Sequence, residues 1–232
     1  MIDVVYILGT GSRWNDNEFR LSLRSLERYG RNVGDVYVIG SLPDWVTGVR
    51  HIPCDDIHPR RCDNAWRKLQ QYTGDKCVLM NDDFYLLQDV DFNSLPNYYD
   101  GTMEGLAQRL TNKYRRITPY VRALETTEAL LIRNGMSTRN YAVHVPMVVD
   151  MSVARVLFSA LGNAPGISFR CLYGNYVNRN CAELADLKFI EPLDVSKAIE
   201  GKTFFSIGDG FLDDAGKAFL FELYSEKSRF EK

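Results

Sequence analysis

Two adjacent carboxylates, Asp82 and Asp83, follow a short apolar segment and are the residues of this chain best suited to carry chemistry. The segment 76–80 is typical of a buried strand, and ligands of open α/β sheets bind at the carboxyl ends of such strands. Neighbouring carboxylates repel each other and are costly to desolvate, and a divalent cation shared with a bound diphosphate relieves both costs. The alternative is an ordinary turn or helix cap, because Asn81 and the two aspartates favour both.

Two glycine-containing loops follow other predicted strands. Gly9-Thr10-Gly11 comes after the apolar run Ile2–Leu8, and its glycines allow backbone N–H groups to approach a nucleotide or a phosphate closely. The pattern lacks the third glycine of a dinucleotide-binding motif, so a tight strand-to-helix turn is the alternative. Asp209 lies in a glycine-flanked loop after the predicted strand 203–207 and is a third carboxylate at a strand end.

Alternating strands and helices must position these residues. A helix that begins at a capping box of Asn15 and Glu18 and ends at Gly30 separates strands 2–8 and 36–39, which is the βαβ pattern of a parallel sheet. We predict further strands at 76–80, 141–146 and 203–207, and further helices at 64–73, 119–133, 150–161 and 213–225. The expected fold is α/β, with a mostly parallel central sheet flanked by helices. We expect one domain over residues 1–232, with a basic, partly helical insertion at about 100–139.

The composition is that of a soluble globular protein, with 45% hydrophobic and 25% charged residues among 232. The net charge of −2 does not by itself indicate a nucleic-acid or membrane partner. No apolar run approaches the ~20 residues of a membrane-spanning helix. We expect no signal peptide at this start, because the apolar run after Met1 is short and no basic segment precedes it. An odd number of cysteines, five, without a Cys-x-x-Cys motif predicts reduced thiols and a cytoplasmic location.

Four possible zinc ligands, His51, Cys54, His58 and Cys62, lie close together in the sequence. Two prolines interrupt them and no Cys-x-x-Cys pair anchors them, so a loop that happens to hold these residues is the favoured interpretation. His144, at the end of the predicted strand 141–146, has a structural role as its simplest explanation.

Basic residues outnumber acidic ones between Arg109 and Arg139. A solvated helical face explains this bias most simply. The alternative is a surface that binds an anionic acceptor, such as nucleic acid or a phosphorylated glycan. The residues that would form this surface are Lys113, Arg115, Arg116 and Arg122.

Several stretches, in order along the chain, resemble the Stealth family, which includes bacterial capsular sugar-phosphate transferases and the animal N-acetylglucosamine-1-phosphate transferase. The segment Ser12-Arg13-Trp14 through Glu27, continued by 36–45 and by Leu79-Met80-Asn81-Asp82-Asp83, resembles the second conserved region. Weaker stretches resemble the first region at 2–6, the third at His144-Val145-Pro146 and the fourth at 204–209. Met147 stands where the family often has a second histidine, and Gly208 where asparagine is usual. Small phage-encoded transferases that move the sugar alone are an equally close resemblance.

The resemblance implies a GT-A-like nucleotide-sugar binding fold, a UDP-sugar donor, and functional roles for Asp83, His144, Arg170 and Asp209. With the charge argument above, it suggests that Asp82, Asp83 and Asp209 hold Mg²⁺ or Mn²⁺ on the diphosphate. Arg170 would stabilise the leaving group, and His144 would act as general base or orient the donor. The nucleotide would be held by Gly9, Thr10, Gly11, Arg13, Asn81 and Asp82.

Because Met147 replaces the second histidine, we expect a glycosyltransferase that moves a sugar to a hydroxyl of a saccharide or of a modified DNA base. One alternative is a sugar-1-phosphate transferase of Stealth type, which releases UMP. The alternative of another class is a non-catalytic module that binds a nucleotide sugar or nucleic acid. Intact carboxylates at two strand ends argue against that module, since a pure binder needs no metal on a leaving group.

Overall fold

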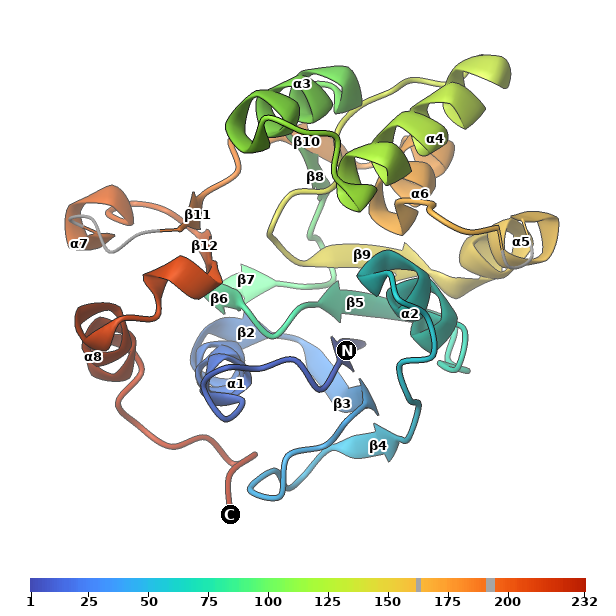
Figure 1. Cartoon of the computed structure of the whole chain (residues 1–232). Coiled ribbons are helices and arrows are strands. Elements are labelled where there is room, and N and C mark those ends of the chain that lie inside the picture. The colour runs from blue at the N-terminus through green and yellow to red at the C-terminus, as the bar shows by residue number, and fades with distance from the viewer. Residues whose placement is uncertain (162–163, 191–194) are drawn as a thin grey trace.

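A five-stranded sheet forms the centre of the computed structural model, which describes residues 1–161, 164–190 and 195–232 (Figure 1). The strand order is β4-β3-β1-β5-β9, with the first four strands parallel and β9 antiparallel to β5. These strands are β1 (Ile2–Leu8), β3 (Val33–Gly40), β4 (Arg50–Ile52), β5 (Lys76–Met80) and β9 (Met147–Asp150). This mostly parallel sheet with helices on both faces is the architecture predicted from the sequence.

The register of β1 and β5 brings the two predicted loops together. Tyr6 of β1 is paired with Met80 of β5 in a parallel ladder. The loop that begins at Gly9 and the pair Asp82–Asp83 therefore leave the sheet at the same edge, two or three residues beyond this pairing. This is the edge at which ligands bind in open parallel sheets.

Alternate side chains of β1 belong to two different cores, one on each face of the sheet. Tyr6 packs with Phe19 of α1, whereas Val5 belongs to the core that contains Trp66 of α2 and Phe169 of α6. Both faces of the strand are buried, which explains why its sequence is apolar without alternation. The helices are α1 (Asn17–Tyr29), α2 (Arg61–Leu69), α3 (Met103–Tyr114), α4 (Pro119–Arg133), α5 (Met151–Leu161) and α6 (Phe169–Val177). The region predicted to be a basic, partly helical insertion thus contains α3 and α4.

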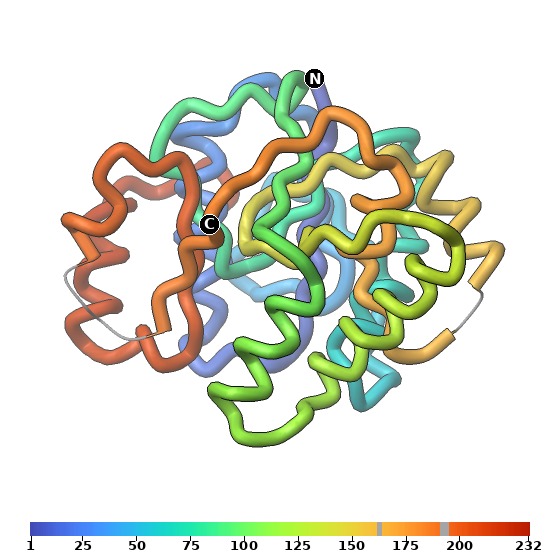
Figure 2. Tube along the Cα trace, turned by 90° about the horizontal axis from the view of Figure 1, so that it is seen from above, coloured from blue at the N-terminus to red at the C-terminus, as the bar shows by residue number. Residues whose placement is uncertain are grey.

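The C-terminal part of the chain builds a small three-stranded sheet beside the central one, in the order β11-β12-β6. Figure 2 shows this part, with α7 and α8, at one end of the molecule and α4, α5 and α6 toward the other. Its elements are β6 (Phe84–Leu86), β11 (Lys188–Phe189), α7 (Val195–Ala198), β12 (Phe204–Ile207), the 3₁₀ helix η1 (Asp209–Phe211) and α8 (Asp214–Leu223). Two further pairs join β2 (Gly30–Arg31) to β7 (Val90–Asp91) and β8 (Asn97–Tyr99) to β10 (Cys181–Glu183).

This small sheet carries two distant segments to the end of β5. β6 begins immediately after Asp83, and its Phe84 is paired with Ser206 of the antiparallel β12. Ser206 is paired on its other side with Lys188 of β11. The predicted strand 203–207 is thus confirmed as Phe204–Ile207, and Asp213 caps the final helix by accepting a hydrogen bond from the backbone N–H of Gly216 at 2.8 Å.

The capping box predicted for Asn15 and Glu18 is wrong. Asn15 and Asp16 both have positive φ angles, 53° and 56°, and α1 begins after them without a side-chain cap from Asp16. The hydroxyl of Ser12 instead accepts hydrogen bonds from the backbone N–H groups of Trp14 and Asp16 and donates to Glu18. A loop that folds back on itself therefore replaces the local side-chain cap that the sequence suggested.

The strand predicted at 141–146 is also wrong, because the residues that pair with β5 are Met147–Asp150. Pro146 has no N–H to donate to a ladder, and the N–H of His144 donates to a side chain instead. Helices 64–73 and 150–161 are present with shifted bounds, as α2 and α5, and the predicted stop at Gly162 lies outside the described residues.

Two further observations concern the chain as a whole. Within the described ranges, none of the helices combines the length and the hydropathy that a membrane crossing requires. All five cysteines are free thiols.

Candidate active site

A cavity of about 650 Å³ opens at the carboxyl edge of the central sheet, where β1 and β5 end. Its volume is in the range of small-molecule binding sites. Most of the residues predicted to bind the nucleotide sugar and the metal line it, although they come from segments far apart in the chain. The predicted residues on its wall are Gly9, Thr10, Gly11, Asn81, Asp82, Asp83, His144, Arg170 and Asp209.

The two adjacent carboxylates have different surroundings. Asp83 Oδ2 accepts from Lys188 Nζ at 3.0 Å and from Ser206 Oγ at 3.4 Å. Asp83 Oδ1 is buried and has no hydrogen-bond partner among the described residues. Burial raises the pKa of Asp82 to about 7, and the nearby charges of Asp83 and Glu18 add to this effect. Two neighbouring carboxylates thus lie at the end of β5, of which Asp83 is paired with Lys188 and Asp82 has no ion-pair partner in the described chain.

These features suit a divalent cation on Asp82 and Asp83, but the predicted set of three carboxylates is not assembled. In residues 1–161, 164–190 and 195–232, no three His, Cys, Asp or Glu side chains gather closely enough to hold a metal ion. The Asp209 carboxylate is 66% exposed and lies 3.9 Å from Arg13, which is not among the residues that line the described cavity. The oxygens of a bound diphosphate would have to supply the remaining ligands.

The lack of a metal-binding cluster among the described residues also argues against zinc at His51, Cys54, His58 and Cys62. Nε2 of His51 lies 2.9 Å from the carbonyl oxygen of Gly40, so this ring is already engaged by the backbone.

The Gly9-Thr10-Gly11 loop passes close to the wall that α2 contributes. Lys68, 2% exposed, donates to the carbonyl oxygen of Leu8 at 2.5 Å and pairs with Asp56 at 2.6 Å. A Cβ atom at Gly9 would lie 2.9 Å from Asp56 Oδ2, so a larger residue there would displace the Asp56 carboxylate. Lys68 and Asp56 also line the cavity, and no sequence pattern had indicated them.

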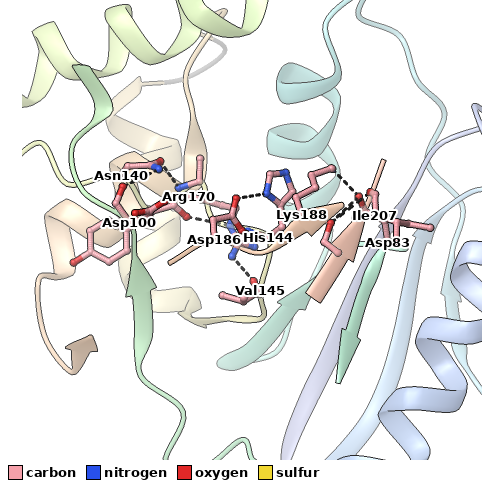
Figure 3. Close-up of polar contacts among 12 residues, drawn as sticks. Asp83, Asp100, Asn140, His144, Val145, Arg170, Asp186, Lys188 and Ile207 are labelled. Carbon is pink, nitrogen blue, oxygen red and sulfur yellow. Dashed lines mark hydrogen bonds and ion pairs between the residues drawn. The ribbon is translucent and has the colours of Figure 1, made fainter. Parts of the chain in front are cut away.

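His144 is held by Asp186, which sequence reasoning missed (Figure 3). The Asp186 carboxylate accepts from the backbone N–H of His144 at 2.8 Å and contacts His144 Nδ1 at 2.6 Å. Burial acts to raise the pKa of Asp186, but the hydrogen bonds and charge of His144 outweigh it and hold that pKa below its ordinary value. Because an ionised carboxylate only accepts, Nδ1 is the donor in this contact, and in the neutral form of the ring Nε2 is the nitrogen that lacks a proton.

Arg170, at the start of α6, lines the cavity and has one donor without a partner in the described chain. Its Nε donates to the carbonyl oxygen of Tyr141 at 3.3 Å, and its Nη2 donates to that of Val145. The guanidinium carbon lies 5.5 Å from the centre of the Phe84 ring. Burial lowers the pKa of Arg170 to about 10, so the group stays charged at neutral pH. Its Nη1 is buried and meets no acceptor in the described chain, which leaves it available to an anion.

A single segment, 186–188, supplies the partners of both His144 and Asp83. Asp186 and Lys188 are two residues apart, so both project from the same side of an extended chain, while Phe189 packs into the adjoining core. The alternation of charged and apolar residues at 186–189 was the available sequence signal. It indicates an edge strand, but it does not specify which residues the charged side chains contact.

The basic residues predicted to form an acceptor surface lie on α3, on α4 and in the turn between them. Lys113, Arg115, Arg116 and Arg122 are exposed, and none of them is among the residues that line the described cavity. Tyr120 and Ala123, in the first turns of α4, do line it. The basic turn therefore lies next to the cavity and outside it.

No family model matches the chain, and no curated protein sequence matches it significantly. Among solved structures, the galactosyltransferase LgtC in complex with donor and acceptor sugar analogues is similar over 100% of this chain and 98% of its own length, at 9% identity and a TM-score of 0.51. The apo form of the glycosyltransferase GlyE of Streptococcus pneumoniae TIGR4 is similar over 97% of this chain and 60% of its own, at 11% identity and a TM-score of 0.48. The apo form of mouse xyloside xylosyltransferase 1 is similar over 100% and 96%, at 9% identity and a TM-score of 0.41. The likeness to LgtC shows that the chain has a GT-A-like fold, as the sequence predicted.

Proposed function

We propose that this protein is a glycosyltransferase that moves a sugar from a nucleotide sugar, a UDP-sugar in our prediction, to an acceptor hydroxyl with the help of Mg²⁺ or Mn²⁺. The observation that carries the proposal is the convergence of two adjacent strand-end carboxylates, a half-buried arginine with an unused donor and an oriented histidine on one cavity of a GT-A-like fold. A binding module would have no need for the histidine or for the charge concentrated at Asp82 and Asp83.

In the proposed reaction the acceptor oxygen forms a bond to the anomeric carbon of the donor sugar, and the bond from that carbon to the diphosphate oxygen breaks. Nε2 of His144 takes the proton of the acceptor hydroxyl, and Asp186 holds the ring in the required tautomer. Arg170 donates from Nη1 to the diphosphate as negative charge develops on it. Asp82 and Asp83 would hold the divalent cation, which neutralises charge on the diphosphate when it is bound. Gly9, Thr10, Gly11 and Asn81 would contact the nucleotide, with Arg13 and Asp209 at the rim.

The test is nucleotide release from a panel of nucleotide sugars with Mg²⁺ or Mn²⁺, scored separately for UDP and UMP. We expect UDP from wild-type protein and at least a hundredfold slower release from His144→Gln and from Asp83→Asn. Lys197→Met, an exposed lysine of α7, is the matched control and should keep the wild-type rate. Full turnover in Asp83→Asn would remove the metal assignment, and no release from any donor, with acceptors added, would favour the binding module.

The second candidate is sugar-1-phosphate transfer of Stealth type, which the ordered resemblance at 12–27, 79–83, 144–146 and 204–209 favours. In that reaction the acceptor oxygen attacks the β-phosphorus and UMP leaves. Release of UMP in the same assay would establish it.

We propose the basic turn between α3 and α4 as the surface for an anionic acceptor, with modified DNA and a charged saccharide as the two candidates. The double charge reversal Arg115→Glu/Arg116→Glu should weaken DNA binding and flatten its salt dependence if DNA is the acceptor. Arg133→Glu is a suitable control, because it lies at the far end of α4, about 20 Å away along the helix axis. Unchanged DNA binding and salt dependence in the double variant would remove DNA and leave the saccharide.

A further inference from the structure

Lys188 occupies the position on Asp83 where a cation would be expected. Its Nζ lies 3.0 Å from Asp83 Oδ2, and the two side chains are only 27% and 22% exposed. The contact is built into the backbone, because Lys188 is in register with Ser206 and Ser206 with Phe84, the residue that follows Asp83. Figure 3 shows Lys188 reaching across β12 to Asp83. The ammonium group is therefore placed by three neighbouring strands.

The two oxygens of Asp83 are used unequally. Oδ2 accepts from both Lys188 and Ser206, whereas Oδ1 is buried and has no hydrogen-bond partner within the described ranges. A divalent cation bound to Oδ1 at the usual ~2.1 Å would lie about 7 Å or less from the Lys188 ammonium, which is 3.0 Å from Oδ2. Two positive groups at that separation repel each other in a poorly solvated site. The free protein is thus ill suited to bind the cation while Lys188 stays on Asp83.

A nucleotide diphosphate changes this balance in two ways. It brings additional oxygen ligands for the cation, and it brings negative charge that can accept the lysine ammonium in place of Asp83. Lysine suits such an exchange, because its ammonium is a compact charge on a flexible four-carbon chain with freely rotating donors. Lys188 lines the same cavity as Arg170, whose Nη1 has no hydrogen-bond partner in the described chain.

We propose that Lys188 holds the place of the divalent cation on Asp83 in the free protein and moves to the donor diphosphate when cation and donor bind together. This inference rests on the proposed function, because it takes the ligand to be a nucleoside diphosphate and its cation. It makes Lys188 a residue that enforces joint binding: the cation binds well only with the nucleotide. It also gives Lys188 a second task, as a contact of the leaving group.

The test is the affinity of the purified protein for Mn²⁺ in the absence of nucleotide, measured by calorimetry or by the paramagnetic resonance signal of free Mn²⁺. We expect weak binding by the wild type and about tenfold tighter binding by Lys188→Met, the effect of removing one moderately strong ion pair that competes for the carboxylate. Lys197→Met, which removes an exposed lysine of α7, should bind Mn²⁺ as the wild type does. The double variant Asp83→Asn/Lys188→Met should lose the gain, because the gain depends on Asp83.

UDP affinity is the second readout. Mn²⁺ should strengthen UDP binding by the wild type, and this coupling should fall by about the same tenfold factor in Lys188→Met, since the coupling between two ligands is reciprocal. If Lys188→Met does not fold, as judged by circular dichroism, Lys188→Gln removes the charge and keeps a hydrogen-bond donor, with the same expectation for Mn²⁺.

Two results would overturn the inference: a Lys188 variant that binds Mn²⁺ with wild-type affinity, or a gain that persists without the Asp83 carboxylate. Failure of the proposed function looks different. In that case UDP would not bind to the wild type even with Mn²⁺, while the comparison of Mn²⁺ affinities would still report on Lys188.

Discussion

Replacing Asp186 with asparagine should reverse the tautomer of His144 with little change in shape. In the wild type the Asp186 carboxylate accepts from the backbone N–H of His144 at 2.8 Å and from Nδ1 at 2.6 Å. Asparagine can still accept from the backbone N–H through its oxygen, but its amide then donates toward the ring. Nδ1 must become the acceptor, and the proton moves to Nε2, the nitrogen that we propose as the base.

The magnitude follows from the role of the histidine. A general base contributes about 10²–10⁴-fold to a rate, so a ring locked in the wrong tautomer should lose a factor in that range from kcat. The KM for the nucleotide sugar should change little, because Asp186 does not act on the donor. The loss of a charge-assisted hydrogen bond should also lower the free energy of unfolding by about 1.5–3 kcal/mol.

The stability effect should depend on pH. The pKa of Asp186 is held below its ordinary value of 3.8. A carboxylate of this kind stabilises the fold above its unfolded pKa, and this contribution is lost as the pH falls through the folded pKa. The stability difference between wild type and Asp186→Asn should therefore be full at neutral pH and should shrink below about pH 4.

Two assays check the reasoning together. Steady-state nucleotide release separates kcat from KM, and the ¹⁵N chemical shifts of the His144 ring report which nitrogen is protonated. A merely structural role for Asp186 would not move the protonated site. Turnover within threefold of wild type, or a ring that keeps its proton on Nδ1 in Asp186→Asn, would refute the proposed orientation.

Three further predictions concern single residues. Asp82→Asn should raise the melting temperature of the metal-free protein at about pH 8 but not at about pH 4. Burial, and then the charges of Asp83 and Glu18, raise the pKa of Asp82 to about 7, so the fold loses stability as the pH rises from about 4 to about 7. An equal gain at both pH values would contradict this. Arg170→Met should weaken UDP binding by about tenfold or more, because the substitution removes the donor at Nη1 that has no acceptor in the described chain. Calorimetry measures the UDP affinity, and an unchanged affinity would exclude Arg170 from the diphosphate site. Glu231→Gln should lower the free energy of unfolding, measured in urea, by about 3 kcal/mol. The Glu231 side chain is 4% exposed, and its Oε1 lies 2.7 Å from Arg24 Nε, so this ion pair joins the C-terminal segment to α1. A loss below ~1 kcal/mol would show that the pair contributes no more than a surface ion pair.

The sequence by itself determined the parts of this protein that depend on short stretches of chain. The apolar runs of β1 and β5 and the helical spacing of α1 and α4 are local patterns, and each was predicted at its place. Asp82 and Asp83 at the end of a buried strand, and a glycine loop after β1, were predicted to face a ligand for the same reason. The parallel register of β1 and β5 then brings these two loops to one edge of the sheet.

The tertiary structure alone decided which distant groups complete the site. Asp186 lies 42 residues from His144 in sequence, and Lys188 lies 105 residues from Asp83. No local pattern specifies such a pair, because the contact depends on the register of β11, β12 and β6. The same limit explains two wrong predictions: Ser12 replaced the expected cap of α1, and the strand that pairs with β5 began after His144. Long-range register and the burial of charge are properties of the folded chain, and they set the partners of both His144 and Asp83.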